Sequence, residues 1–153
     1  MNRLADFSSV FLRLALGISF LSAVADRFGF SGAYGQPNVA WGDFPHFLAY
    51  TAKLNAFAPL TAIPGLAWLA TCAETLLGVL LILGLFTRIS ALLSGVLLLL
   101  FALTMTYALG IKAPLNVSVF SASAGAFLLA SCVRFPYSID SVRPSVDAAN
   151  REK

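Results

Sequence analysis

Two charged residues lie inside long apolar stretches of the sequence, and they are the first candidates for chemistry. Arg13 falls in the first apolar run and Glu74 in the second. A charge among apolar residues is costly to expose to lipid, so it usually faces a polar interior and marks a functional site. A glycine follows each charge four residues later, Gly17 or Gly78, and therefore lies on the same helix face. We expect both charges to point inward, toward close helix contacts.

The relation between Arg13 and Glu74 has two interpretations. In the first, they form a structural ion pair that only organises packing. In antiparallel helices, however, Glu74 is level with about Ser19 or Phe20, which leaves Arg13 roughly 9 Å away along the axis. Side chains lean toward their own helix N-terminus, which separates the two further. In the second interpretation, water or a bound polar headgroup fills this gap, so that Arg13 holds the headgroup and Glu74 handles its protons.

A few other residues could contact a cofactor. Trp41 and His46 lie in a long loop rich in glycine and proline, and Asn116 lies near the start of the fourth apolar run. His46 is the single histidine and has no cysteine nearby, so we expect no metal site. Asn116 also suits helix capping. Together with Gly17 and Gly78, these three complete the set of candidate binding residues, and no sequence motif for a covalently bound cofactor is present.

Four apolar runs must position these residues. The chain is 59% hydrophobic and only 11% charged, whereas soluble domains are about 25% charged. Each run approaches the roughly 20 residues that span a bilayer. We therefore predict an all-α integral membrane protein, a four-helix transmembrane bundle forming one membrane domain over residues 1–153, with spans at about 7–25, 63–86, 89–109 and 115–133.

The connections are expected to differ in character. The outer loop, residues 27–62, is long for so small a bundle, and its apolar residues recur near helical spacing between Phe44 and Phe57. This pattern predicts a short interfacial helix that acts as a lid over the mouth of the bundle. Asp26 and Arg27, where the first span ends, are interpreted as an interfacial anchoring pair. Residues 134–153 form a polar tail.

Basic residues predict the orientation of the chain. Six of them fall on the side of the termini, namely Arg3, Arg88, Arg134, Arg143, Arg151 and Lys153, and three fall on the other side, namely Arg27, Lys53 and Lys112. The positive-inside rule then places both termini in the cytoplasm of a bacterial cell, with the protein in its inner membrane. Because the basic residues are scattered and form no continuous patch, nucleic acid is excluded as a partner.

Three stretches together resemble the DoxX family of small four-helix membrane proteins. They are Leu12-Arg13-Leu14-Ala15-Leu16-Gly17 with Phe20, Glu74 to Gly78 continuing to Leu83-Gly84-Leu85-Phe86-Thr87-Arg88, and Pro136-Tyr137-Ser138-Ile139-Asp140. Members of that family typically have His-Gly and a Lys at the end of the first span, where this chain has Ala25-Asp26-Arg27. A role tied to those family positions does not transfer to this chain.

The resemblance implies an association with membrane oxidoreductases, since the family takes its name from a subunit of a thiosulfate:quinone oxidoreductase. We expect a quinone-interacting or accessory subunit in which Arg13 and Glu74 serve a bound quinone, with a soluble or membrane redox partner or further copies of the chain. Any enzymatic activity would be that of a quinone-linked oxidoreductase. A non-catalytic anchor for a soluble redox or stress-response partner is the alternative. A small transporter ranks last, because the spans hold few polar residues.

Overall fold

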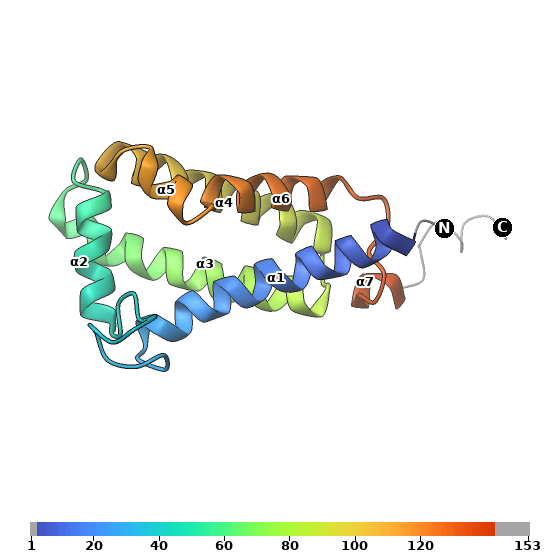
Figure 1. Cartoon of the computed structure of the whole chain (residues 1–153), viewed down its shortest axis with the longest axis horizontal. Coiled ribbons are helices and arrows are strands. Elements are labelled where there is room, and N and C mark those ends of the chain that lie inside the picture. The colour runs from blue at the N-terminus through green and yellow to red at the C-terminus, as the bar shows by residue number, and fades with distance from the viewer. Residues whose placement is uncertain (1–2, 143–153) are drawn as a thin grey trace, which may run out of the picture.

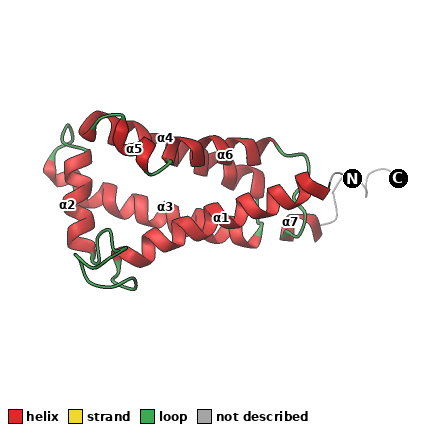
Figure 2. Cartoon of the chain, viewed as in Figure 1, coloured by secondary structure: helices red, strands yellow, loops and turns green. Residues whose placement is uncertain are grey.

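A computed structural model of the chain describes residues 3–142, and within that range every regular element is a helix (Figure 2). The elements are α1 (Arg3–Arg27), α2 (Phe44–Leu54), the short 3₁₀ helix η1 (Leu60–Ala62), α3 (Ile63–Leu83), α4 (Thr87–Leu109), α5 (Lys112–Asn116), α6 (Val119–Ser131) and α7 (Ile139–Val142). The prediction of an all-α protein is confirmed. The distal tail, with Arg143, Arg151 and Lys153, lies outside the described residues.

The long helices run side by side and α2 lies across one end of them (Figure 1). Successive long helices run in opposite directions, so the starts of α1 and α4 and the turn between α3 and α4 lie at the same end of the bundle as α7. The closest packing is between α1 and α3 and between α4 and α6. The molecule is therefore built from two tight helix pairs, and α2 contacts both of them through α3 and α4.

Three segments are long and apolar enough to cross a membrane: α1, η1 with α3, and α4. The predicted fourth span, residues 115–133, is not one continuous helix. That region contains α5 and then α6, which has only 13 residues. The helices are separated at Ser118, whose φ of 56° lies in the left-handed region and so cannot continue a right-handed helix.

The outer loop contains a helix in the region where one was expected. α2 begins after Asp43, whose carboxylate accepts a hydrogen bond from the His46 backbone N–H at 2.8 Å, and Pro45 occupies its first turn. Such a cap satisfies a donor that the helix itself leaves unpaired. α2 ends at Leu54, one turn earlier than Phe57. Its buried residues are Phe47, Thr51 and Leu54, so one face is turned toward the bundle.

Small residues set the spacing of the second helix pair. The Ser123 hydroxyl of α6 donates a hydrogen bond to the Gly95 carbonyl oxygen of α4 at 2.8 Å. A Cβ on Gly95 would lie 2.7 Å from the Phe127 ring, so this contact requires glycine. Close backbone approach through small residues is typical of helix pairs in membranes. The apolar core then extends between both pairs through Leu16, Phe20, Leu77, Leu81, Ala91, Ala126 and Leu129.

The first part of the predicted tail is packed against the bundle. The carboxylate of Asp140 accepts hydrogen bonds from the backbone N–H groups of Phe86 at 2.9 Å and Thr87 at 2.7 Å. Its own backbone N–H donates to the Gly84 carbonyl oxygen at 3.1 Å. These bonds tie the region around α7 to the turn between α3 and α4. The start of the predicted polar tail, residues 134–142, is therefore held on the bundle by Asp140.

Candidate functional site

The contact between Gly17 and Gly78 fixes the register of α1 on α3. A Cβ on Gly17 would lie 2.9 Å from the Gly78 carbonyl oxygen, and a Cβ on Gly78 would lie 3.1 Å from the Gly17 carbonyl oxygen. The two glycines therefore face each other across an antiparallel contact, as their spacing from the charges predicts. They were candidate binding residues, but their mutual contact leaves no room for a ligand between them. Their part in the site is to hold α1 and α3 close together.

Glu74 forms an ion pair with Arg27 instead of Arg13. A terminal nitrogen of Arg27, Nη2, lies 2.5 Å from Glu74 Oε2, and both side chains are almost completely buried. Arg27 Nη1 also donates a hydrogen bond to the Thr71 hydroxyl at 3.1 Å. Thr71 in turn donates to the Ala67 carbonyl oxygen one turn earlier in α3. The C-terminal end of α1 is thus joined to α3 by one buried polar cluster.

The direction in which helical side chains lean explains this pairing. With Gly17 opposite Gly78, Glu74 is level with Leu21, roughly midway between Arg13 and Arg27 in the sequence of α1. Side chains lean toward the N-terminus of their own helix. Arg27 therefore leans toward Glu74 and Glu74 leans toward Arg27, whereas Arg13 leans away. The interpretation of Asp26 and Arg27 as an interfacial anchoring pair is wrong, since both side chains are buried against the protein.

Aromatic rings from the outer loop cover the Arg27 guanidinium. Its central carbon, Cζ, lies 3.8 Å from the centroid of the Phe47 ring and 5.2 Å from that of Trp41. A cation against an aromatic face is attracted by the negative π surface, more strongly where water is excluded. Trp41 and Phe47 also contact each other edge to face, with centroids 5.1 Å apart. Trp41, a predicted candidate, is therefore part of this cluster.

Asp26 holds the end of the loop over the cluster. Its Oδ2 accepts hydrogen bonds from the backbone N–H groups of Ala40 at 3.2 Å and Trp41 at 2.7 Å. Its other oxygen, Oδ1, is buried without a hydrogen-bond partner in the described part of the chain, and the same is true of Arg27 Nε. Sequence reasoning interpreted both residues as an interfacial anchoring pair and did not place them in this site. Two features of the sequence could have placed them in the site, namely their position beside a long loop and the direction in which Arg27 leans, which is toward Glu74.

Arg13 belongs to a different site at the opposite end of the bundle. It is buried, as predicted, but its Nη2 donates to the Tyr137 carbonyl oxygen at 2.7 Å and its Nη1 to the Pro136 carbonyl oxygen at 3.4 Å. It therefore fastens the segment before α7 to α1. The structure does not bring Arg13 and Glu74 together.

The remaining candidates lie away from the ion pair. His46 stacks on Tyr34, with ring centroids 3.8 Å apart, and its Nδ1 lies 2.7 Å from Asp43 Oδ1. The backbone and side-chain hydrogen bonds from His46 hold the pKa of the Asp43 carboxyl below its usual range. Asn116 is exposed at the end of α5, a helix that packs on α4 and α6. These contacts indicate structural roles for His46 at the start of α2.

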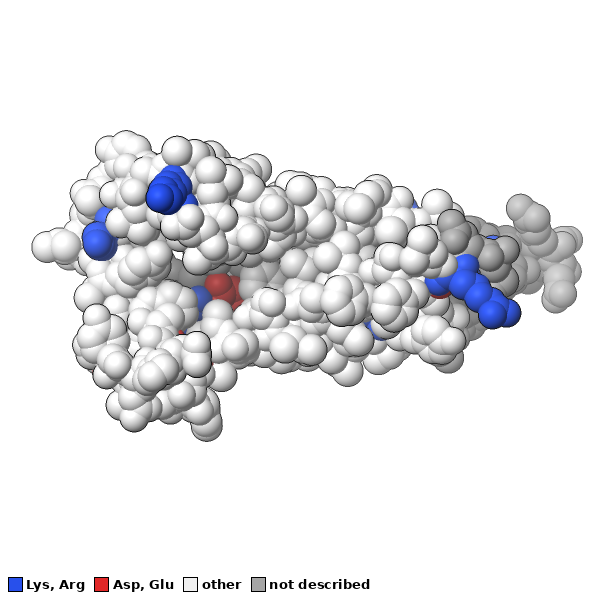
Figure 3. Space-filling view, in the orientation of Figure 1, with Lys and Arg blue, Asp and Glu red and all other residues white. Residues whose placement is uncertain are grey.

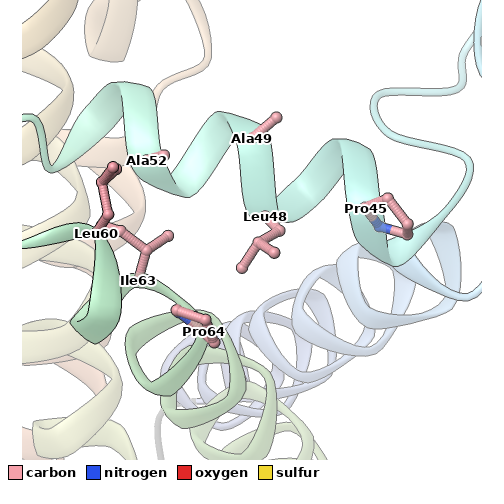
Figure 4. Close-up of a pocket in the computed structure, with 7 residues that line it drawn as sticks. All are labelled: Pro45, Leu48, Ala49, Ala52, Leu60, Ile63 and Pro64. Carbon is pink, nitrogen blue, oxygen red and sulfur yellow. The ribbon is translucent and has the colours of Figure 1, made fainter.

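The face shown in Figure 3 is hollowed beside α2, between the α1–α3 pair and the α4–α6 pair. Acidic and basic atoms are visible at the bottom of this hollow. A separate groove of about 300 Å³ lies between α2 and the start of α3 (Figure 4) and is lined only by apolar residues and prolines: Pro45, Leu48, Ala49, Ala52, Leu60, Ile63 and Pro64. That groove has no side chain to hold a polar headgroup, so the buried ion pair remains the candidate site.

The fold and the cluster define a small helical membrane protein with a buried ion pair in its outer-loop half. Comparison with family models matches residues 8–107 to the family described as DoxX. The chain belongs to the DoxX family. The matched region extends from α1 through most of α4 and so contains the whole cluster of Asp26, Arg27, Trp41, Phe47 and Glu74. No curated protein and no solved structure matches the chain.

Proposed function

We propose that this protein binds the headgroup of a quinone at the Arg27–Glu74 pair and serves as a membrane subunit of an oxidoreductase system. The observation that carries the proposal is the ion pair itself, which is buried between α1 and α3 and covered by Phe47. Charged groups inside a membrane helix are costly and usually serve a function. From the sequence, the headgroup was assigned to Arg13 and Glu74, and in this proposal Arg27 replaces Arg13 in that role.

The chemistry of the pair suits a quinone. A guanidinium N–H can donate a hydrogen bond to a quinone carbonyl oxygen, and a neighbouring carboxyl can exchange a proton with it. Reduction of a quinone to a hydroquinone takes up two electrons and two protons. Arg27 and Glu74 can supply positioning and protons but no electrons. The proposal therefore requires a redox partner that carries a flavin or a metal centre and delivers the electrons.

The surroundings of the pair also support binding of a flat aromatic headgroup. Trp41 and Phe47 present ring faces and edges at the cluster, and offset or edge-to-face contacts between rings are favourable. The hollow beside α2 provides a lateral route from the lipid between the two helix pairs (Figure 3). A lipophilic ligand could thus approach without leaving the apolar phase.

The same proposal includes a location in the cell membrane. In it, α2 lies at the outer interface of a bacterial inner membrane and both termini lie in the cytoplasm. Arg3, Arg88 and Arg134 belong to the end of the bundle where α1 begins and α7 lies, and Lys53 and Lys112 to the α2 end. This distribution supports the orientation under the positive-inside rule.

Purification in mild detergent, followed by mass spectrometry of the copurifying lipids, tests the proposal. Wild type should retain a quinone, and Glu74→Gln or Arg27→Gln should lose it. Arg13→Gln is a matched control, because it removes a similarly buried arginine of α1 that lies outside the cluster. Equal quinone in all four proteins, or none in wild type, would contradict the proposal.

One observation supports the alternative interpretation, in which the protein anchors a soluble partner at the membrane. At the end of the bundle opposite α2, a groove of about 370 Å³ is lined by Asp6, Val133, Arg134, Phe135, Pro136, Asp140 and Ser141. Its mixed polar and apolar lining could receive a segment of a soluble partner. If wild type retains no quinone but a soluble protein copurifies and is released by Arg134→Glu, this interpretation replaces the first.

A further inference from the structure

Apart from Glu74 Oε2, which Arg27 contacts as an ion pair, one donor and one acceptor of the buried cluster have no hydrogen-bond partner in the described residues. Arg27 uses Nη1 for Thr71 and Nη2 for Glu74, and Asp26 uses Oδ2 for the two backbone N–H groups of the loop. Arg27 Nε and Asp26 Oδ1 are buried without a hydrogen-bond partner in the described residues. A buried polar atom without a partner is strongly unfavourable, so such an atom calls for an explanation.

The two atoms belong to one local site. Asp26 and Arg27 are consecutive at the end of α1, and the Asp26 carboxylate lies close enough to the Arg27 guanidinium to attract it electrostatically. Both side chains are more than nine-tenths buried, with 6% and 2% of their residue surface exposed. The Trp41 and Phe47 rings lie near the guanidinium, and its Nε–H is the buried donor that has no hydrogen-bond partner in the described residues.

The character of these atoms selects among ligand groups. Arg27 Nε–H can only donate a hydrogen bond and Asp26 Oδ1, as a carboxylate oxygen, can only accept one. A hydroxyl group satisfies both, because it donates one hydrogen bond and accepts others. A carbonyl oxygen satisfies only Arg27 and would leave Asp26 Oδ1 unpaired beside it. An anionic group would be repelled by the Asp26 carboxylate.

We infer that this site discriminates the redox state of its ligand and binds a hydroquinone in preference to the corresponding quinone. The inference rests on the proposed function and adds a specificity residue, Asp26, to it. In this proposal the hydroquinone hydroxyl donates to Asp26 Oδ1 and accepts from Arg27 Nε. Preferential binding of the reduced form raises the reduction potential of the bound couple, by about 30 mV for each tenfold preference in a two-electron reaction.

The substitution Asp26→Asn gives a sharp test. The amide oxygen can still accept the hydrogen bonds from the loop, while the amide NH₂ replaces the leftover acceptor by a donor. We expect the wild-type protein in lipid nanodiscs, under anaerobic conditions, to bind a short-chain benzohydroquinone about tenfold more tightly than its benzoquinone, which corresponds to one hydrogen bond. In Asp26→Asn this ratio should fall below one. Asp43→Asn, a carboxylate outside the cluster, should leave the ratio unchanged.

A second ligand keeps the test independent of the variant. Hydroquinone dimethyl ether keeps the ring and both oxygens of the hydroquinone, with a methyl group on each oxygen, and cannot donate a hydrogen bond, so wild type should bind it no better than the quinone. Equal affinities of wild type for hydroquinone, dimethyl ether and quinone would overturn the inference, and would mean that a water molecule occupies the leftover positions. If none of the three ligands binds, the proposed function itself fails.

Discussion

Gly17 of α1 and Gly78 of α3 face each other so closely that neither can carry a side chain without displacing the other helix. A Cβ on Gly17 would lie 2.7 Å from Ile82 Cγ1 and 2.9 Å from the Gly78 carbonyl oxygen. The side chain of Ile82 could rotate, but the backbone oxygen cannot move without the helix. This contact sets both the distance and the register between the helices that carry Arg27 and Glu74.

Gly17→Ala should therefore destabilise the protein by about 1–3 kcal/mol, the usual cost of overpacking. Unfolding in mixed detergent micelles, followed by circular dichroism, measures it. Gly65→Ala is the matched control, because a Cβ at Gly65 in the first turn of α3 meets nothing within 4 Å. That control should be neutral or slightly stabilising. Equal effects of the two substitutions would show that the helix contact is looser than described.

The Arg27–Glu74 pair should show strong energetic coupling. Arg27→Gln or Glu74→Gln alone leaves an uncompensated buried charge, which typically costs about 3–5 kcal/mol. The double variant Arg27→Gln/Glu74→Gln should cost clearly less than the sum of the two single substitutions. A double-mutant cycle from detergent unfolding curves measures the coupling. Strictly additive effects would argue that the two side chains do not interact.

The start of α2 should become less stable in acid. Hydrogen bonds from His46 lower the pKa of Asp43 in the folded state, so Asp43 stabilises the folded form above its unfolded pKa of about 4. This contribution is lost as the pH falls through the lower, folded pKa. Amide hydrogen exchange should therefore show weaker protection of residues 44–54 below about pH 4. Asp43→Asn keeps a capping side chain without the titration, and should show a flat pH profile.

Asp140 should hold the segment around α7 on the bundle. It accepts hydrogen bonds from the Phe86 and Thr87 backbone N–H groups at the start of α4. Asp140→Ala should cost about 0.5–2 kcal/mol, as the loss of a helix cap does. It should also increase proteolytic cleavage between residues 133 and 142. Asp140→Asn retains an acceptor and should have a smaller effect, and unchanged cleavage in both variants would contradict this role.

Much of the fold could be predicted from the periodicity and length of apolar runs, because these depend on local sequence alone. Three long helices and the helix after Asp43 lie where the pattern indicates. The break at Ser118 could not be predicted in this way, because neither glycine nor proline marks that residue. The contacts of Asp140 depend on segments more than 50 residues apart, which no local pattern reports.

The candidate site was predicted in part. Glu74 and Trp41 belong to it, and the burial of Arg13 was anticipated. The partner of Glu74 was missed because two arginines on α1 are at comparable distances along the axis, and register alone does not separate them. The lean of each side chain toward its own N-terminus decides between them. The role of Asp26 was not predicted because its partners are backbone N–H groups. Almost every residue has such a group, so the residue types in the sequence do not reveal these contacts.

The division into two helix pairs has a consequence for biosynthesis. The α1–α3 pair, including the Arg27–Glu74 contact, lies entirely within residues 3–83, and the α4–α6 pair within residues 87–131. Helices that insert first can associate in the bilayer afterwards. The N-terminal hairpin can therefore pair Arg27 with Glu74 while the ribosome is still translating the second hairpin. Arg13, in contrast, gains its Pro136 and Tyr137 partners only after the C-terminal segment has been made.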